Sequence, residues 1–92
     1  MKVHVRYQAQ ARYAAGVASE TVEVADGAPL ETVVRRLAET HGERLQKHLL
    51  GADGHLSPHV LFFRNDCQEN GSGTTAIQEG DLLTILSPMA GG

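Results

Sequence analysis

The chain has 92 residues, of which 41% are hydrophobic and 21% are charged, and its net charge at pH 7 is −3. This composition predicts one globular domain over residues 1–92. The negative net charge argues against a nucleic-acid partner, and no apolar stretch is long enough to predict a membrane partner. A single cysteine cannot form an internal disulfide, and no signal-peptide pattern precedes the first strand pattern, so we expect a cytoplasmic location.

The first elements show the two-residue period of β-strands. Val3, Val5 and Tyr7 alternate with polar residues, which predicts a half-buried strand. A second strand is expected at residues 21–24, with Val22 and Val24 pointing inward. Residues 9–19 are rich in alanine and are expected to form the hairpin connection between the two strands.

The next segment has the period of an amphipathic helix. Pro29 suits its first position and Gly42 suits the residue after its last turn. Its apolar residues fall three and four apart on one stripe, at Leu30, Val33, Val34, Leu37 and Ala38.

The second half of the chain predicts further strands. Leu45, Leu49 and Leu50 suggest a short second helix before a turn at residues 51–54. Strands are expected at residues 60–63 and 82–86, separated by a polar loop at 67–75 that holds at most a short edge strand. One main helix crossing one mixed sheet predicts an α+β domain.

The last two predicted strands carry apolar residues on both faces, although one helix covers only one face of a sheet. Two interpretations stay open. In the first, residues 43–58 fold over the second face. In the second, that face docks a partner through Phe63, Leu82 and Leu86, or their neighbours of opposite parity, continuous with Met89.

The chain closes on Met89-Ala90-Gly91-Gly92, immediately after the last predicted strand and the pair Ser87-Pro88. Two glycines without side chains suit a tail that enters a narrow channel, whereas the alternative is an ordinary frayed terminus. The segment from residue 76 to residue 92 resembles the C-terminal signature of the MoaD/ThiS-type ubiquitin-like sulfur carriers, and residues 5–9, 12–16 and 20–24 resemble the first hairpin of that family. Gln8 and the turn at residues 64–66 depart from the family pattern.

This resemblance implies a ubiquitin-like β-grasp fold and a carrier that has no catalytic residue and binds no cofactor itself. An E1-like partner enzyme would use ATP to adenylate Gly92, and sulfur would then displace AMP to give a thiocarboxylate. Gly91, Ala90 and Met89 would thread the tail into the partner, and a synthase subunit would accept the sulfur.

The length of the chain, mainly through residues 43–58, favours the small subunit of molybdopterin synthase among the carriers. A carrier for thiamin, cysteine or another sulfur metabolite is the first alternative. A protein modifier conjugated through Gly92 is the second, and a passive interaction module is the third.

Other reactive side chains are interpreted as structural. His55 and His59, with His48 or Cys67, imitate the spacing of a zinc site. Pro58 lies between the first two and disfavours a rigid helical pair, so we predict no metal site. Cys67 has acidic neighbours that do not favour a reactive thiolate, and it is expected to be an ordinary surface cysteine.

Overall fold

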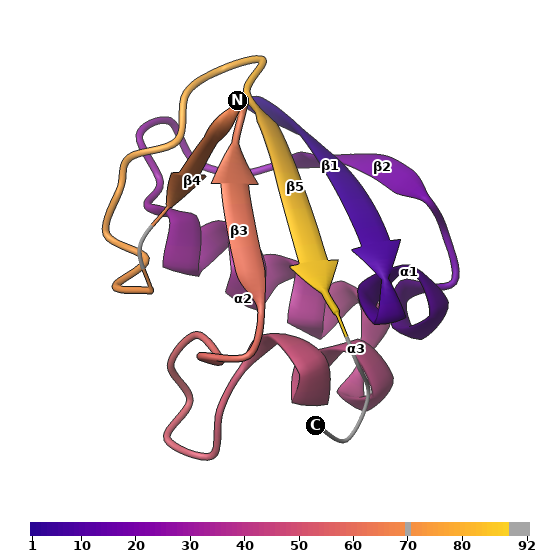
Figure 1. Cartoon of the computed structure of the whole chain (residues 1–92). Coiled ribbons are helices and arrows are strands. Elements are labelled where there is room, and N and C mark those ends of the chain that lie inside the picture. Colours follow the sequence, from indigo (N-terminus) through magenta and orange to yellow (C-terminus); the bar gives the residue numbers. More distant parts are fainter. Residues whose placement is uncertain (70, 89–92) are drawn as a thin grey trace.

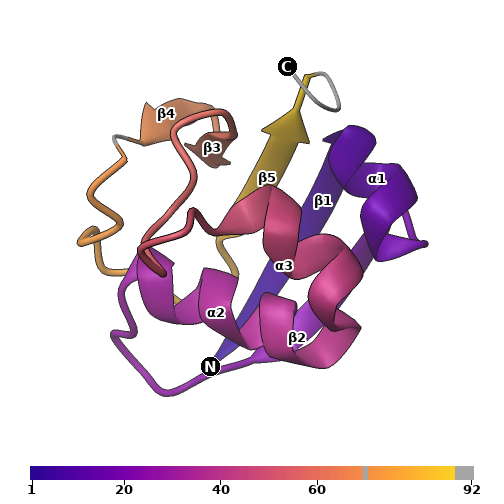
Figure 2. The same ribbon diagram turned by 90° about the horizontal axis from the view of Figure 1, so that it is seen from below.

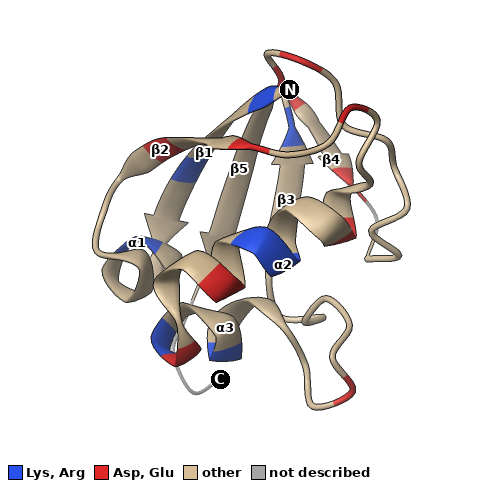
Figure 3. Cartoon of the chain, turned by 180° about the vertical axis from the view of Figure 1, so that it is seen from behind, with Lys and Arg blue, Asp and Glu red and all other residues tan. Residues whose placement is uncertain are grey.

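Two layers make up the fold, a mixed sheet and a set of helices packed on one of its faces (Figures 1 and 3). The computed structural model describes residues 1–69 and 71–88. Its elements in chain order are β1 (Lys2–Ala9), α1 (Gln10–Ala15), β2 (Ser19–Glu23), α2 (Leu30–His41), α3 (Glu43–Leu49), β3 (Leu61–Arg64), β4 (Cys67–Glu69) and β5 (Leu82–Ser87). The expected α+β class is confirmed.

The sheet has five strands in the order β2-β1-β5-β3-β4. The central pair, β1 and β5, is parallel, and the other neighbouring pairs are antiparallel. The predicted alternation of β1 is confirmed, since Val3, Val5 and Tyr7 are buried between exposed residues. The short edge strand is confirmed as β4. The last strand before the tail therefore lies in the middle of the sheet, with a hydrogen-bonded strand on each side.

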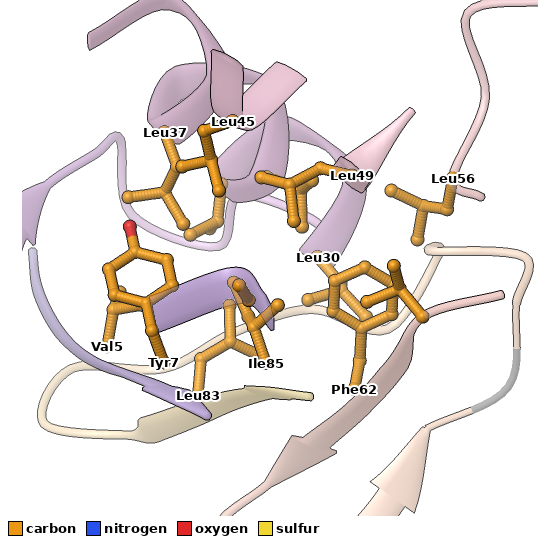
Figure 4. Packing of buried hydrophobic residues seen from close by; sticks show 14 of the residues in the cluster. Val5, Tyr7, Leu30, Leu37, Leu45, Leu49, Leu56, Phe62, Leu83 and Ile85 are labelled. Carbon is orange, nitrogen blue, oxygen red and sulfur yellow. The ribbon is translucent and has the colours of Figure 1, made fainter. Parts of the chain in front are cut away.

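The predicted main helix is confirmed as α2. It begins one residue after Pro29, and Gly42 ends it with a positive φ of 82°. All the residues of the predicted stripe are buried at 0–3% exposure. Leu30, Val33, Val34 and Leu37 form one core with the inward residues of β1, β5 and β3, shown in Figure 4 as Val5, Tyr7, Leu83, Ile85 and Phe62.

The second predicted helix is present as α3, but it does not cover the second face of the sheet. Leu45 and Leu49 are fully buried in the same core as α2. Figure 4 shows Leu45 beside Leu37 and above the ring of Tyr7. Figure 2 shows α3 alongside α2. The interpretation in which residues 43–58 fold over the opposite face is therefore wrong, because both leucines complete the existing core.

The connection between β1 and β2 is also more ordered than expected, because it contains α1. Ala11 and Ala14 are buried on its inner side, and Gly16 ends the helix in the left-handed conformation at φ 81°. A six-residue helix has little stability alone, so its packing against β1, β5 and α3 holds it in place. This packing brings α1 next to the end of β5.

Candidate docking face and tail attachment

The strand that precedes the tail is held along its whole length. On one side β5 pairs with β1, from Leu82 opposite His4 to Ser87 opposite Ala9. On the other side it pairs with β3, where Leu86 lies opposite Leu61. Pro88 is exposed and is the last described residue. The predicted tail and carrier residues, Met89, Ala90, Gly91 and Gly92, lie outside the described residues.

The face of the sheet opposite the helices carries an apolar group that we call the open-face patch. It comprises Leu61, Phe63, Leu82 and Leu86. Phe63, Leu82 and Leu86 are half-buried, and Leu61 is 36% exposed. No described helix lies over this face (Figure 1). The structure thus brings the three residues that the sequence predicted for docking onto one surface.

Leu61 was missing from the predicted set, although the alternation of side chains along its strand could have identified it. Phe62 is 2% exposed and points into the core. Since side chains alternate along a strand, its neighbours on both sides must point away from the core. Leu61 also lies directly opposite Leu86 in the antiparallel register, so the two side chains share a face.

Polar residues of the central strands complete the open face. Thr84 lies between Leu82 and Leu86 along β5 and is only 4% exposed. The guanidinium of Arg6 on β1 donates to its hydroxyl oxygen at 3.2 Å. The face therefore has an apolar centre on β5 and β3 and a polar margin on β1, which is the usual composition of a protein interface.

Asp81 fixes the start of β5. Its carboxylate accepts hydrogen bonds from the Gln78 amide at 2.9 Å and from the Asn65 side chain at 3.2 Å, and Arg64 lies 3.5 Å away. Burial acts to raise the pKa of Asp81, but these hydrogen bonds and the arginine charge outweigh it and hold the pKa below its ordinary value. The Asn65 side chain also accepts from the Leu82 amide at 3.0 Å. This network joins the β3–β4 turn to β5.

A second polar cluster lies on the helix side of the sheet and was not predicted. The Tyr7 hydroxyl donates to a Glu20 carboxylate oxygen at 2.6 Å, and His41 Nε2 hydrogen-bonds with the same oxygen. The rings of Tyr7 and His41 meet edge to face, with centroids 5.9 Å apart. Burial, followed by the hydrogen bond to Glu20 and its charge, raises the pKa of the Tyr7 hydroxyl. The cluster ties β1, β2 and the end of α2 together and has a structural role.

The remaining candidates do not assemble into a reactive site. Among residues 1–69 and 71–88, no three His, Cys, Asp or Glu side chains gather as a metal ion would need. His55 lies 3.4 Å from the Glu31 carboxylate, and Cys67 is exposed on the edge strand β4. None of the described helices is long and apolar enough to span a membrane.

Comparison with known proteins supports the fold and the family. SAMP1 from Haloferax volcanii, known from a crystal structure, shares 25% identity and a TM-score of 0.86, with 100% of each chain covered. The HVO 2177 protein of the same organism shares 30% identity and a TM-score of 0.82, over 100% of this chain and 87% of the other. A chain of the Amycolatopsis orientalis BexX/CysO complex shares 27% identity and a TM-score of 0.69, over 98% of this chain and 99% of the other.

These neighbours have the ubiquitin-like β-grasp arrangement, so the fold expected from the resemblance is confirmed. No relative was found among the curated proteins. A family model, in contrast, matches residues 5–92, from the first strand through both terminal glycines. The chain therefore belongs to the ThiS family, as a small ubiquitin-like protein of the sulfur carrier and modifier class.

Proposed function

We propose that the chain is a sulfur carrier that is activated at the carboxylate of Gly92. The main support is the family match, which extends over residues 5–92 and so includes the glycine pair itself. A second support is the position of β5. This strand is paired with β3 up to Leu86 and with β1 up to Ser87, so the sheet holds the start of the segment that follows in a fixed position.

The proposed chemistry requires no catalytic group on this chain. In the first step a carboxylate oxygen of Gly92 bonds to the α-phosphorus of ATP in the partner, and pyrophosphate leaves. In the second step a hydrosulfide sulfur attacks the carbonyl carbon, and AMP leaves with one carboxylate oxygen. The result is a thiocarboxylate, AMP and a released proton. Adenylation is needed because a carboxylate is a poor electrophile and AMP is a good leaving group.

The open-face patch is proposed to dock the adenylating enzyme and the sulfur-accepting synthase subunit in turn. Phe63, Leu82 and Leu86 lie on the face that the helices leave free, and Leu86 is two residues before Pro88. The neighbouring CysO structure was solved in a complex with BexX, so a protein of this fold can be bound by a partner of a different kind. Met89, Ala90 and Gly91 would then enter the active site of the partner.

Within the carrier class, we favour a role like that of the molybdopterin synthase small subunit. We attribute the length expected beyond a compact thiamin-type carrier to residues 43–58, which form α3 and the loop that follows it. Carriers for thiamin, cysteine or another sulfur metabolite are the alternatives. The genes adjacent to this one would distinguish them, because a carrier is commonly encoded with the enzymes it serves.

In the experiment, the chain is co-expressed with the adenylating enzyme from the same genome and supplied with ATP and a sulfide donor. Intact mass should show one oxygen exchanged for sulfur, and the exchange should lie in the C-terminal peptide. The control is the chain without Gly92, which should keep the unfolding midpoint of the wild type and lose the exchange. A wild-type chain that is never adenylated or thiolated under these conditions would support a passive interaction module instead.

A protein modifier is the second candidate, because Haloferax volcanii SAMP1 is named a small archaeal modifier protein. A modifier and a carrier share the adenylate and differ in the nucleophile that attacks it, a lysine amine or a sulfur. Lysine peptides with a Gly-Gly remnant from this tail would indicate a modifier. Free thiocarboxylate without such peptides would indicate a carrier.

A further inference from the structure

The charged residues of this protein are separated along the direction of the central strands. Where β1 and β5 begin, the exposed acidic residues are Glu23, Asp26, Asp66 and Glu79. Two of them contact the start of the chain, since Asp26 pairs with the terminal amine and Glu79 accepts from the Lys2 amide. This end of the molecule, near the N label in Figure 3, is mostly acidic.

The opposite end, where β5 stops, carries a group of exposed cations on two short helices. α1 and α3 contact each other there, and α1 also contacts β5. These two helices carry Arg12, Arg44 and Lys47, all exposed. The carboxylates at this end are Glu43 on α3 and Asp53 in the loop that follows it (Figure 3). Among the described residues no ion pair or side-chain hydrogen bond involves these three cations. We call them the tail-end rim.

Helix stability does not explain the whole rim. Arg12 and Lys47 lie in the last turns of their helices, where a positive charge is favourable. Arg44, however, is the second residue of α3, where a positive charge opposes the helix dipole. The dipole of α3 is therefore not stabilised by Arg44, whereas the exposed position of Arg44, on a helix that contacts α1, suits an external anionic group.

We propose that the tail-end rim steers the chain onto an acidic protein surface that surrounds the tail-accepting channel of the activating enzyme. This inference rests on the proposed function and adds the chemistry of the partner surface. Charges at the margin of an interface mainly change the association rate and its salt dependence. Here the acidic end of the molecule would be repelled by the same partner surface, so the charge separation orients the tail end toward the channel.

An acidic protein fits these observations better than a nucleic acid. Three exposed cations can neutralise few phosphates, and nucleic-acid affinity depends on the number neutralised. The net charge of −3 and the acidic far end would also oppose the field of a polyanion. The three cations at one end of the molecule instead match a small acidic protein surface around the tail-accepting channel of the activating enzyme.

The test compares two variants that each remove two exposed positive charges. Arg12→Gln with Arg44→Gln removes one rim charge from each helix. Lys2→Gln with Arg36→Gln is the matched control, because both residues are exposed, lie outside the rim, and have no side-chain ion pair within the described part of the chain. Glutamine keeps the length of the side chains, and the unfolding midpoint of each variant checks the fold.

Association with the activating enzyme is measured by stopped flow at several salt concentrations. The rim variant should associate roughly tenfold or more slowly than wild type at low salt and should approach wild type at high salt. The control should differ little at any salt concentration. Thiocarboxylate yield is measured separately, so that failure of the proposed function is distinguished from failure of the rim.

Three results would overturn the inference. The first is equal slowing by the two variants, which would reflect net charge alone. The second is an association of the wild type that does not depend on salt. The third is a wild type that binds total tRNA together with a rim variant that does not, while both associate with the enzyme at the same rate. The rim would then serve a nucleic acid.

Discussion

Phe62 and Phe63 provide a matched test of the open-face patch, because they are the same residue type on opposite faces of β3. Phe62 is 2% exposed in the core, whereas Phe63 is half-buried on the open face opposite Thr84. Phe62→Ala and Phe63→Ala delete the same atoms. Truncation of a core phenylalanine costs about 3–5 kcal/mol of unfolding free energy, a large share of the roughly 5–15 kcal/mol that stabilises a typical domain.

The same comparison can be expressed as unfolding temperatures. A change of about 1 kcal/mol moves the midpoint by about 4–8 °C in a domain of this size. Phe62→Ala should therefore lower the midpoint by roughly 12–40 °C. The Phe63 side chain is already partly in water, so its truncation should cost about 1 kcal/mol, or roughly 4–8 °C.

Binding should show the opposite order. At a temperature where both variants are folded, calorimetric titration with the activating enzyme should show Phe63→Ala weakened about tenfold or more, which is the effect expected of a central interface residue. Phe62→Ala, if folded, should bind nearly as wild type. The reasoning fails if Phe63→Ala destabilises the fold as much as Phe62→Ala does, or if it binds the enzyme with unchanged affinity.

Three further substitutions test the elements that hold the site. Gly73→Ala should lower the free energy of unfolding by about 1–3 kcal/mol, because Gly73 has φ +69° and an added Cβ would lie 2.9 Å from two side-chain carbons. Gly71→Ala, with nothing within 4 Å of the added atom, should have little effect in the same denaturant titration. Asp81→Asn should reduce the loss of unfolding free energy at acid pH. The lowered pKa of Asp81 stabilises the fold at pH values above the ordinary aspartate pKa of 3.8. This contribution is lost as pH falls through the lower pKa of the folded state. An unchanged pH dependence of stability below about pH 4 in the variant would contradict the lowered pKa of Asp81. Tyr7→Phe should cost about 1.5–3 kcal/mol through loss of a hydrogen bond to a carboxylate, whereas Tyr13→Phe, at 68% exposure, should be neutral by thermal unfolding.

Local periodicity was sufficient to predict most of the elements. The stripe from Leu30 to Ala38 repeats at helical spacing over more than two turns, and the alternation from Val3 to Tyr7 repeats at strand spacing. Each pattern arises because one face of the element is buried, so it can be recognised without knowing what buries it. The same reasoning found β5, and the terminal motif gave the β-grasp class.

Relations between distant residues could not be predicted in this way. The spacing of Leu45 and Leu49 indicates an apolar helix face, but it does not indicate which face of the sheet that helix covers. The helix α1 is too short to be stable alone, and it packs against β1, β5 and α3. The cluster of Tyr7, Glu20 and His41 joins residues that are far apart in sequence. In each case a tertiary contact, absent from the local pattern, determines the outcome.

The length of the tail sets a limit on where a partner can bind. Four residues follow Pro88, and a fully extended chain spans at most about 3.3–3.6 Å per residue, so Gly92 can reach about 14 Å beyond Pro88. An enzyme that acts on Gly92 must therefore contact the fold close to the end of β5. Leu86 lies in the last apolar row of the open face, whereas Leu82 lies at the far end of the strand.

This limit predicts a gradient of binding energy along β5. Both leucines are half-buried and of the same type, so Leu86→Ala and Leu82→Ala should have similar effects on the unfolding midpoint. Leu86→Ala should weaken binding to the activating enzyme more than Leu82→Ala does, because contacts near the tail position Gly92 directly. Equal losses of binding affinity would indicate a partner that contacts the whole open face. A greater loss of affinity for Leu82→Ala would contradict the limit set by the length of the tail.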